Sequence, residues 1–461
     1  APNARLINLR VLNSEGVGST SAVLSALDWV MTNRSAFNIR VVNMSLGMPA
    51  VDSYRNDPVC LAVRRLVDAG VVVVASAGNN GKNSSGQKIY GQIKSPGIEP
   101  SAITVGAANT FGTDARDDDT VTTFSSRGPT RGFRTDANGV KHYDNLVKPD
   151  IVAPGNKLVY AEAADNLLVR QNPQLDAGVS PVADRKMMYM NGTSMAAPVA
   201  AGTAALLLQA NPSLTPNLVK MILMYTAQPL ANFNMFEQGA GELNIEGAMR
   251  LARLVRGDLQ ATTPVGAPLL TSATPPAPRT TIAGKTFTWS QGIIVGPTYA
   301  YGSDLITKYQ KVYGLGVMIS DGVMVSDGVM VSDGVMVSDG VMVSDGVAVS
   351  DGVMVSDGVM ISDKSWMSSG VILGEHILTS NGIILADGTV FMDVHMLLGD
   401  GVMVSDGVVV SDGVVISDRT VSGNGVMVSD ATLQALSACI NGDNTIETNV
   451  EADAGMDYLG Y

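Results

Sequence analysis

The sequence predicts a doubly wound α/β fold with a parallel sheet, followed by an all-β domain built from short repeats. Helical and strand patterns alternate through the first part of the chain, which is typical of a parallel sheet covered by helices on both faces. From residue 316 to 430 the hexapeptide Gly-Val-Met-Val-Ser-Asp recurs, with a one-residue shift at Asp400. Because its period is even, each repeat keeps the side-chain alternation of a strand.

The α/β pattern starts near the N-terminus. Residues 20–34 carry five apolar side chains at helical spacing, and residues 59–69 form a second helical segment that Gly70 ends. Four consecutive valines, residues 71–74, predict a strand that is buried on both faces. The predicted strands are residues 40–46, 71–76 and 102–107.

The string Asn191-Gly-Thr-Ser-Met-Ala-Ala-Pro198 precedes an apolar run, residues 199–208, that predicts a buried helix. Ser194 then lies in the first helical turn. There the positive end of the helix dipole and unpaired N–H groups suit an oxyanion formed in acyl transfer. Ser194 is therefore the candidate nucleophile, and the alternative is an inert serine at a helix N-terminus.

This string and several other segments of residues 1–256 resemble segments that occur in the same order in the subtilisin-like serine peptidases. The resemblance implies that Ser194 is the nucleophile and that Asn79, in Ala-Gly-Asn-Asn-Gly, donates to the oxyanion. It also implies that two segments bind the substrate as a strand, Ser45-Leu46-Gly47 and Ala77-Gly78. Further matching segments are residues 124–129, 148–155 and 238–241.

The same resemblance implies a catalytic Asp and His, in D-T/S-G and H-G-T-H types of motif, that this sequence does not contain. Its histidines are His142, in a charged loop, and His376 and His395, in the repeat region. The first four residues resemble the family about twenty residues beyond its catalytic His. We therefore expect an N-terminally incomplete catalytic domain, inactive alone, whose Asp and His come from an N-terminal partner fragment.

Composition suggests five regions along the 461 residues. They are a subtilisin-like portion at 1–256, a Pro/Thr-rich linker at 257–280, an unassigned segment or repeat cap at 281–315, the hexapeptide repeats at 316–430 and an acidic tail at 431–461. The net charge is −13, and the repeat region holds 15 Asp and one Glu against Lys364 and Arg419. Such an acidic half disfavours nucleic-acid binding.

Two folds of the repeats are compatible with the pattern. In a left-handed parallel β-helix, three hexads form one coil, the valines point inward and Asp-Gly marks the bends. In a β-meander, short strands would reverse at each Asp-Gly, and both faces of the sheet would need covering. We favour the β-solenoid because it buries its valines without a second layer to cover them. Its outward row would comprise Met318, Met324, Met330, Met336, Met342, Met354 and Met360.

An exposed methionine row is an apolar patch, which usually marks a protein interface. The alternative function is therefore a catalytically silent structural subunit that forms filaments through its repeats. The Asp column is a candidate Ca²⁺ site if carboxylates stack, or otherwise a row of solvated turn residues. No other cofactor is predicted.

The remaining features concern the compartment and the partners. Cys60 and Cys439 imply no disulfide framework, and no run of eighteen apolar residues predicts a membrane span. The resemblance implies an extracellular or cell-surface location and protein or peptide substrates.

Overall fold

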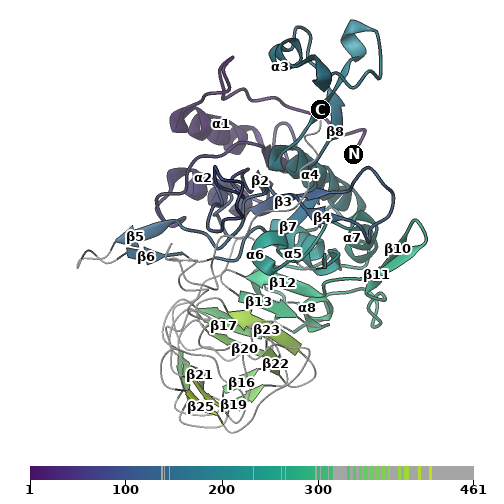
Figure 1. Ribbon diagram of the computed structural model, residues 1–461. Helices are drawn as coiled ribbons and strands as arrows, with labels where there is room; N and C mark the ends of the chain where they lie inside the picture. Colours follow the sequence, from purple (N-terminus) through teal and green to yellow (C-terminus); the bar gives the residue numbers. More distant parts are fainter. Residues whose placement is uncertain are drawn as a thin grey trace.

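The computed structural model describes residues 1–314, apart from 136–138, 140, 145, 232, 261, 265, 296–297, 302 and 310, and a set of short strands beyond them. His376, His395, the acidic tail and the Asp column, apart from the backbone of Asp393, lie outside the described residues. Figure 1 shows the α/β part with its helices around a central sheet.

The central sheet is mixed. Its parallel strands run in the order β1 (Val41–Met44), β2 (Val72–Ser76), β3 (Ile103–Asn109) and β7 (Ile151–Pro154). β4 (Thr120–Val121) pairs antiparallel with the end of β3. A wholly parallel sheet was expected, but residues 110–119 contain no helix to carry the chain back for parallel pairing. The α/β class is confirmed and its strictly parallel form is wrong.

The first two helices begin where capping residues stand. In α1 (Thr20–Asn33), Ser19 Oγ accepts a hydrogen bond from Ala22 N at 3.2 Å. In α2 (Pro58–Asp68), Asp57 Oδ1 accepts from Val59 N at 2.8 Å, and Pro58 occupies the first helical position. Both helices confirm the predicted ranges to within one or two residues.

The valine run of β2 is buried on both faces. Val72 and Val74 belong to the cluster that includes α4 (Thr193–Ala210), α5 (Pro216–Thr226) and α7 (Ile245–Ala252). Val71 and Val73 belong to the cluster formed with α1 and α2. Alternate residues of one strand thus supply two cores, as the period of two requires. This places the helix that carries Ser194 against one face of the sheet.

The main core does not end at residue 256. Leu269 and Leu270 are buried in it, so the segment expected to be an extended linker is partly packed. Trp289 is buried edge-to-face against Tyr225, with ring centroids 6.4 Å apart. Every residue of α5 is buried, and both β12 (Gly292–Val295) and the 3₁₀ turn at Lys311–Tyr313 pack against it. The segment that the sequence left unassigned, with a repeat cap as one possibility, thus contributes buried residues to the α/β core.

Several shorter elements complete the described part of the α/β region. They are β5 (Phe133–Thr135), β6 (Lys141–Tyr143), β8 (Leu158–Ala161), α3 (Leu167–Gln171), β9 (Met187–Met190), α6 (Met235–Gln238), β10 (Arg279–Ile282), β11 (Lys285–Thr288), β12 (Gly292–Val295), β13 (Thr298–Tyr301) and α8 (Asp304–Thr307), with 3₁₀ turns at Pro173–Leu175, Ala183–Arg185 and Lys311–Tyr313.

Within the repeats, short strands pair in parallel at more than one offset. Ile372 pairs with Met403 and Met403 with Val415, at offsets of 31 and 12 residues, whereas four other pairings share one offset. Met336 pairs with Met354 and Met342 with Met360, an offset of eighteen residues or three hexads. One antiparallel sheet has the order β12-β13-β23-β22. The segments that join these strands lie outside the described residues, so the solenoid stays a prediction. The strands are β14 (Met330–Ser332), β15 (Met336–Ser338), β16 (Met342–Ser344), β17 (Val347–Ser350), β18 (Met354–Ser356), β19 (Met360–Ser362), β20 (Ser365–Ser368), β21 (Ile372–Leu373), β22 (Ile383–Leu385), β23 (Thr389–Asp393), β24 (Met403–Ser405) and β25 (Val415–Ser417).

Candidate active site

Ser194 is the second residue of α4, as the sequence predicts. Gly192 precedes the helix with φ +140°, a conformation that disfavours any side chain, and its N–H donates to Gly155 O at 2.8 Å. Ser194 Oγ donates to Ser45 O at 3.3 Å, and Ser45 Oγ donates to Ser194 O at 2.7 Å. The candidate nucleophile is thus fastened to the end of β1.

Pro198 explains why Ser194 O is open to this contact. In an α-helix, the carbonyl of residue 194 would accept from the N–H of residue 198. Proline has no N–H, so that carbonyl loses its helical donor. Ser45 Oγ takes the place of the missing N–H. A proline in the second turn of α4 therefore couples the nucleophile segment to the strand expected to align substrate.

Asn79 lies beside the start of α4 with its amide held in one orientation. Asn79 Oδ1 accepts from both Thr193 N and Thr193 Oγ1, each at 2.9 Å. Thr193 Oγ1 in turn accepts from Gly78 N at 3.1 Å. Because the oxygen is engaged twice, Nδ2 is the end of the amide left to donate toward a reacting group. Asn79 and Ser194 are brought together as the sequence predicts.

The loop that carries Asn79 is supported by residues 124–129. Ser126 N donates to Gly78 O at 2.9 Å, and Ser126 Oγ accepts from Asn80 N at 3.0 Å. Arg127 is buried, donates to Gly81 O and lies 3.2 Å from Glu237 Oε1. The Phe-Ser-Ser-Arg-Gly-Pro segment thus positions the Asn79 loop through hydrogen bonds to the residues on either side of Asn79.

The two segments expected to bind substrate follow neighbouring strands. Ser45, Leu46 and Gly47 continue β1, while Ala77 and Gly78 continue β2. Ser76 Oγ donates to Leu46 O at 3.4 Å, which ties the segments together. Their role in substrate binding stays a prediction.

The described part of the chain places no histidine beside Ser194. His142 lies in β6, and Figure 1 shows the β5–β6 hairpin at the left edge of the molecule, well away from α4. The described residues contain no group of three or more His, Cys, Asp or Glu suited to a metal ion.

A family model for the subtilases, named Peptidase_S8, matches residues 1–247. The chain belongs to the subtilase family. The serine protease AprX of Bacillus subtilis is 35% identical over 254 residues, which make up 54% of this chain and 52% of AprX. Subtilisin DY of Bacillus licheniformis is 32% identical over 248 residues, which make up 54% of this chain and 69% of that protein. The chain thus spans about half the length of AprX.

Among solved structures, fervidolysin from Fervidobacterium pennivorans, a keratinolytic enzyme related to subtilisin, is 24% identical. The alignment covers 55% of this chain and 31% of that one, with a TM-score of 0.38.

A buried cluster of charges fastens β7 in this subtilase. Asp150 lies 2.7 Å from Lys148 Nζ and 2.8 Å from Lys220 Nζ, and both ammonium groups donate to Ala102 O. Burial lowers the pKa of Lys220 to about 7, although Asp150 opposes the shift. The cluster joins β7 to α5 and to the start of β3, so the Lys-Pro-Asp string is structural.

The Gln-Gly-Ala-Gly string closes the fold against the same strand. Gly239 has φ +62°, and a Cβ there would lie 2.3 Å from Asp150 O. Ala240 N donates to Asp150 O at 2.9 Å. Only glycine permits this approach at residue 239.

A second buried cluster was not predicted. Asp119 and Glu242 have fully buried carboxylates, and Arg116 lies 3.2 Å from each. Burial, together with the nearby Asp119, raises the pKa of Glu242 well above its ordinary value, and Arg116 opposes the shift. No sequence motif marks the cluster, because its members come from the loop before β4 and the segment before α7.

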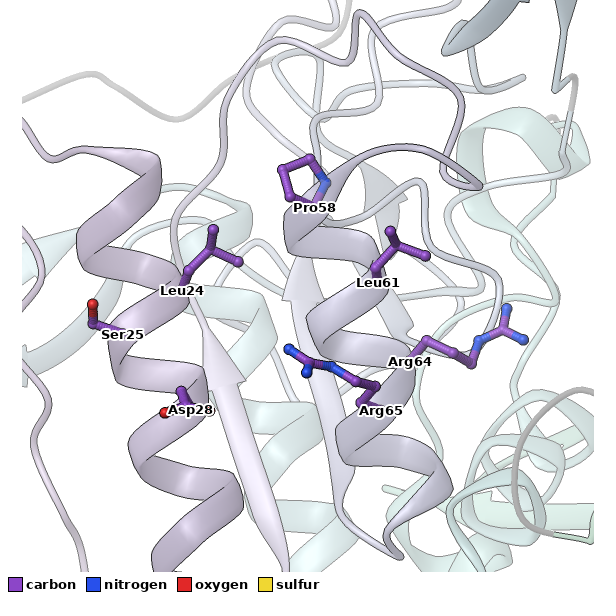
Figure 2. Close-up of a pocket in the computed structure, with 7 residues that line it drawn as sticks. All are labelled: Leu24, Ser25, Asp28, Pro58, Leu61, Arg64 and Arg65. Atoms are coloured by element: carbon purple, nitrogen blue, oxygen red, sulfur yellow. The ribbon is translucent and has the colours of Figure 1, made fainter.

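The surface also has a groove outside the candidate site. It lies between α1 and α2 and has a volume of about 730 Å³. In Figure 2, Leu24 projects from α1 toward α2, Leu61 lies on α2, and the side chain of Arg65 extends toward α1.

By length and composition, α4 could cross a membrane, and it is the one such helix in the described part of the chain. This is weak evidence for a span, since half of that window is buried and core helices pass the same test.

Proposed function

We propose that the protein is a subtilisin-type serine endopeptidase whose nucleophile and oxyanion donors lie on this chain. Ser194 Oγ attacks the scissile carbonyl, and the new oxyanion accepts from Asn79 Nδ2 and from the Ser194 N–H. That N–H is in the first turn of α4, where helical donors have no intrahelical partner. The observation that carries the proposal is the pair of Thr193 hydrogen bonds that orients Asn79 beside Ser194.

The substrate is proposed to lie as a strand along Ser45–Gly47 and Ala77–Gly78. Its scissile carbonyl would then stand between the end of β1 and the Asn79 loop. The mutual hydrogen bonds of Ser45 and Ser194 support this placement, because they fix the distance between the proposed substrate strand and the nucleophile.

The Asp and the H-G-T-H type His that act as the general base are proposed to come from a segment outside these 461 residues, and a separate N-terminal fragment is one form that it could take. The base takes the Ser194 proton during attack and returns it to the leaving amine. The absence of any His in such a motif among the 461 residues motivates this step. The enzyme is proposed to act outside the cell or at its surface.

The first test compares the isolated chain with the chain plus such a fragment. Without its His, activity on casein or a chromogenic peptide should fall roughly a million-fold, as loss of a triad residue does in subtilisin. Intact-mass analysis of the purified protein should reveal the second, shorter chain. Full protease turnover by the isolated chain would contradict the shared active site.

The second test uses the complemented enzyme. Ser194→Ala should abolish turnover, and Asn79→Ala should lower kcat by roughly 10²–10³ with little change in KM, since it removes one oxyanion donor. Asn80→Ala is the matched control, because its backbone N–H still donates to Ser126 Oγ. A loss confined to KM would mean that Asn79 binds substrate rather than the transition state.

The repeat region supports a second proposal, in which residues 316–430 form a β-solenoid that assembles with other protein surfaces. Parallel pairing at an offset of three hexads favours it, since a coil of three hexads repeats at that interval. A purely structural, filament-forming subunit is the competing function. Retention of assembly by Ser194→Ala, with no detectable turnover in the complemented wild type, would favour that alternative.

A further inference from the structure

Lys94 lies between the two segments proposed to hold the substrate. Lys94 N donates to Ala77 O at 3.0 Å, beside β2. The next residue, Ser95, exchanges backbone hydrogen bonds with Met48 at 2.9 and 3.0 Å, beside the extension of β1. The backbone of Lys94 thus spans the space from one segment to the other.

The side chain of Lys94 occupies that space because both neighbours are glycines. A Cβ on Gly47 would lie 2.9 Å from Lys94 Cβ, and a Cβ on Gly78 would lie 2.6 Å from Lys94 Cγ. Both distances are shorter than van der Waals contact. The aliphatic stem of Lys94 therefore packs directly on the backbones of Gly47 and Gly78.

This position adjoins the reacting atoms. Gly78 immediately precedes Asn79, and Gly47 is two residues from Ser45, whose carbonyl accepts from Ser194 Oγ. A scissile carbonyl held by Ser194 and Asn79 carries its own residue's side chain on the adjacent Cα. That side chain would enter the space beside Gly47 and Gly78, where it meets Lys94.

Lys94 brings a charge without a counter-ion. Among the residues that the structure describes, its ammonium donates no hydrogen bond and forms no ion pair. Two acidic side chains near Lys94 are already engaged. Asp57 accepts from Oγ of the adjacent Ser95 at 2.6 Å, and Glu99, five residues along the chain, lies 2.6 Å from Arg64. A half-buried cation of this kind would pair favourably with a carboxylate of the substrate.

We propose that Lys94 determines specificity by selecting an acidic side chain, Glu or Asp, on the N-terminal side of the scissile bond. The inference rests on the proposed function and assigns its substrate class. Lys94 acts by binding and takes no part in the proton transfers.

The test uses fluorescent tetrapeptides that differ only in the last residue before the scissile bond: Glu, Gln, Leu or Lys. Binding to the 461-residue chain is measured by anisotropy, and cleavage by the complemented enzyme as kcat/KM. Both should favour Glu over Gln by about tenfold at low salt, and the preference should shrink as ionic strength rises. The Lys peptide should be the poorest.

Variants separate the charge from the packing. Lys94→Gln should bring the Glu/Gln ratio close to one, whereas Lys94→Arg should keep most of the preference. Lys285→Gln is the matched control, since it removes a lysine charge from the β10–β11 hairpin, where Lys285 pairs with exposed Asp117. It should leave the ratio unchanged.

The possible results separate the role of Lys94 in specificity from the proposed peptidase function on which it rests. Peptides that bind and are cleaved with equal preference for Glu and Gln would overturn the role of Lys94 alone. The same holds if Lys94→Gln changes every peptide by the same factor, because Lys94 would then only fill space. If no peptide of the panel is bound or cleaved, the proposed substrate site fails, and the specificity with it.

Discussion

Replacing Thr193 by valine removes the hydroxyl that organises the oxyanion side of the site and keeps the residue's shape. Thr193 is fully buried, and its Oγ1 accepts from Gly78 N at 3.1 Å and donates to Asn79 Oδ1 at 2.9 Å. Two hydrogen bonds at about 1 kcal/mol each, with Gly78 N left unpaired, give a loss of about 2–4 kcal/mol in the free energy of unfolding. For a large domain, that lowers Tm by roughly 4–16 °C.

The catalytic effect of Thr193→Val should be smaller than that of losing Asn79 itself. Thr193 N still donates to Asn79 Oδ1, so the amide keeps one of its two anchors. We expect kcat in the complemented enzyme to fall about tenfold with KM unchanged, against 10²–10³ for Asn79→Ala.

The assay for this prediction combines steady-state kinetics on a chromogenic peptide with thermal unfolding at one fixed scan rate, since unfolding of proteases is often irreversible. Thr193→Ser is the matched control, because it retains the hydroxyl and should keep kcat within about twofold. If serine is as damaging as valine, the methyl packing matters and the hydroxyl does not. If valine leaves both kcat and Tm unchanged, the reasoning about Asn79 is refuted.

Two further predictions concern stability and assembly. Glu242→Gln should flatten the fall in Tm as pH rises past the unfolded pKa, because burial beside Asp119 raises the folded pKa of Glu242 well above its unfolded value near 4.3. Between those two values the folded chain holds a proton that the unfolded chain has lost, so wild-type stability falls as pH rises through that window; parallel curves for both proteins would contradict this. In the repeats, Val337→Asp should disrupt the stack by burying a charge, whereas the triple change of Met330, Met336 and Met342 to Ser should leave circular dichroism intact and weaken assembly in sedimentation. The opposite result would mean that the inside and outside of the solenoid are reversed.

The elements that the sequence predicted well are those with local causes. The helix at residues 20–34 has its cap and its apolar spacing within one segment, and the strand at 71–76 has its burial marked by consecutive valines. The position of Ser194 in the first turn of a helix followed from the apolar run behind it. Such signals lie within about fifteen residues and need no knowledge of the rest of the chain.

The features that the sequence did not predict depend on contacts between distant segments. The Asp119–Glu242–Arg116 cluster joins residues more than a hundred positions apart, and single acidic residues carry no sign of burial. Leu269 and Leu270 stand in a Pro/Thr-rich stretch whose composition suggested a linker, yet they are buried in the core. Nothing in the sequence distinguishes Lys94 from a surface lysine, because only the fold brings Gly47 and Gly78 against its side chain.

The segment around Ser194 shows why a short motif can predict a site when each of its residues has a different structural role. Gly192 supplies the positive φ that turns the chain into the helix, and Ala197 is small enough to be buried against the sheet. Thr193 orients the asparagine amide, and Ser194 carries the hydroxyl. Pro198 frees a helical carbonyl for the end of β1.

These roles meet at two consecutive residues. Thr193 holds Asn79 on the oxyanion side of the site, and Ser194 is hydrogen-bonded to Ser45 on the proposed substrate side. The first turn of α4 therefore sets the distance between nucleophile, oxyanion donor and proposed substrate strand in a single rigid unit. A change that loosens either contact should alter the geometry on both sides of the scissile bond. The effects of Thr193→Val and Ser45→Ala should accordingly be non-additive in a double-mutant cycle on kcat, and simple additivity would mean that the two contacts act independently.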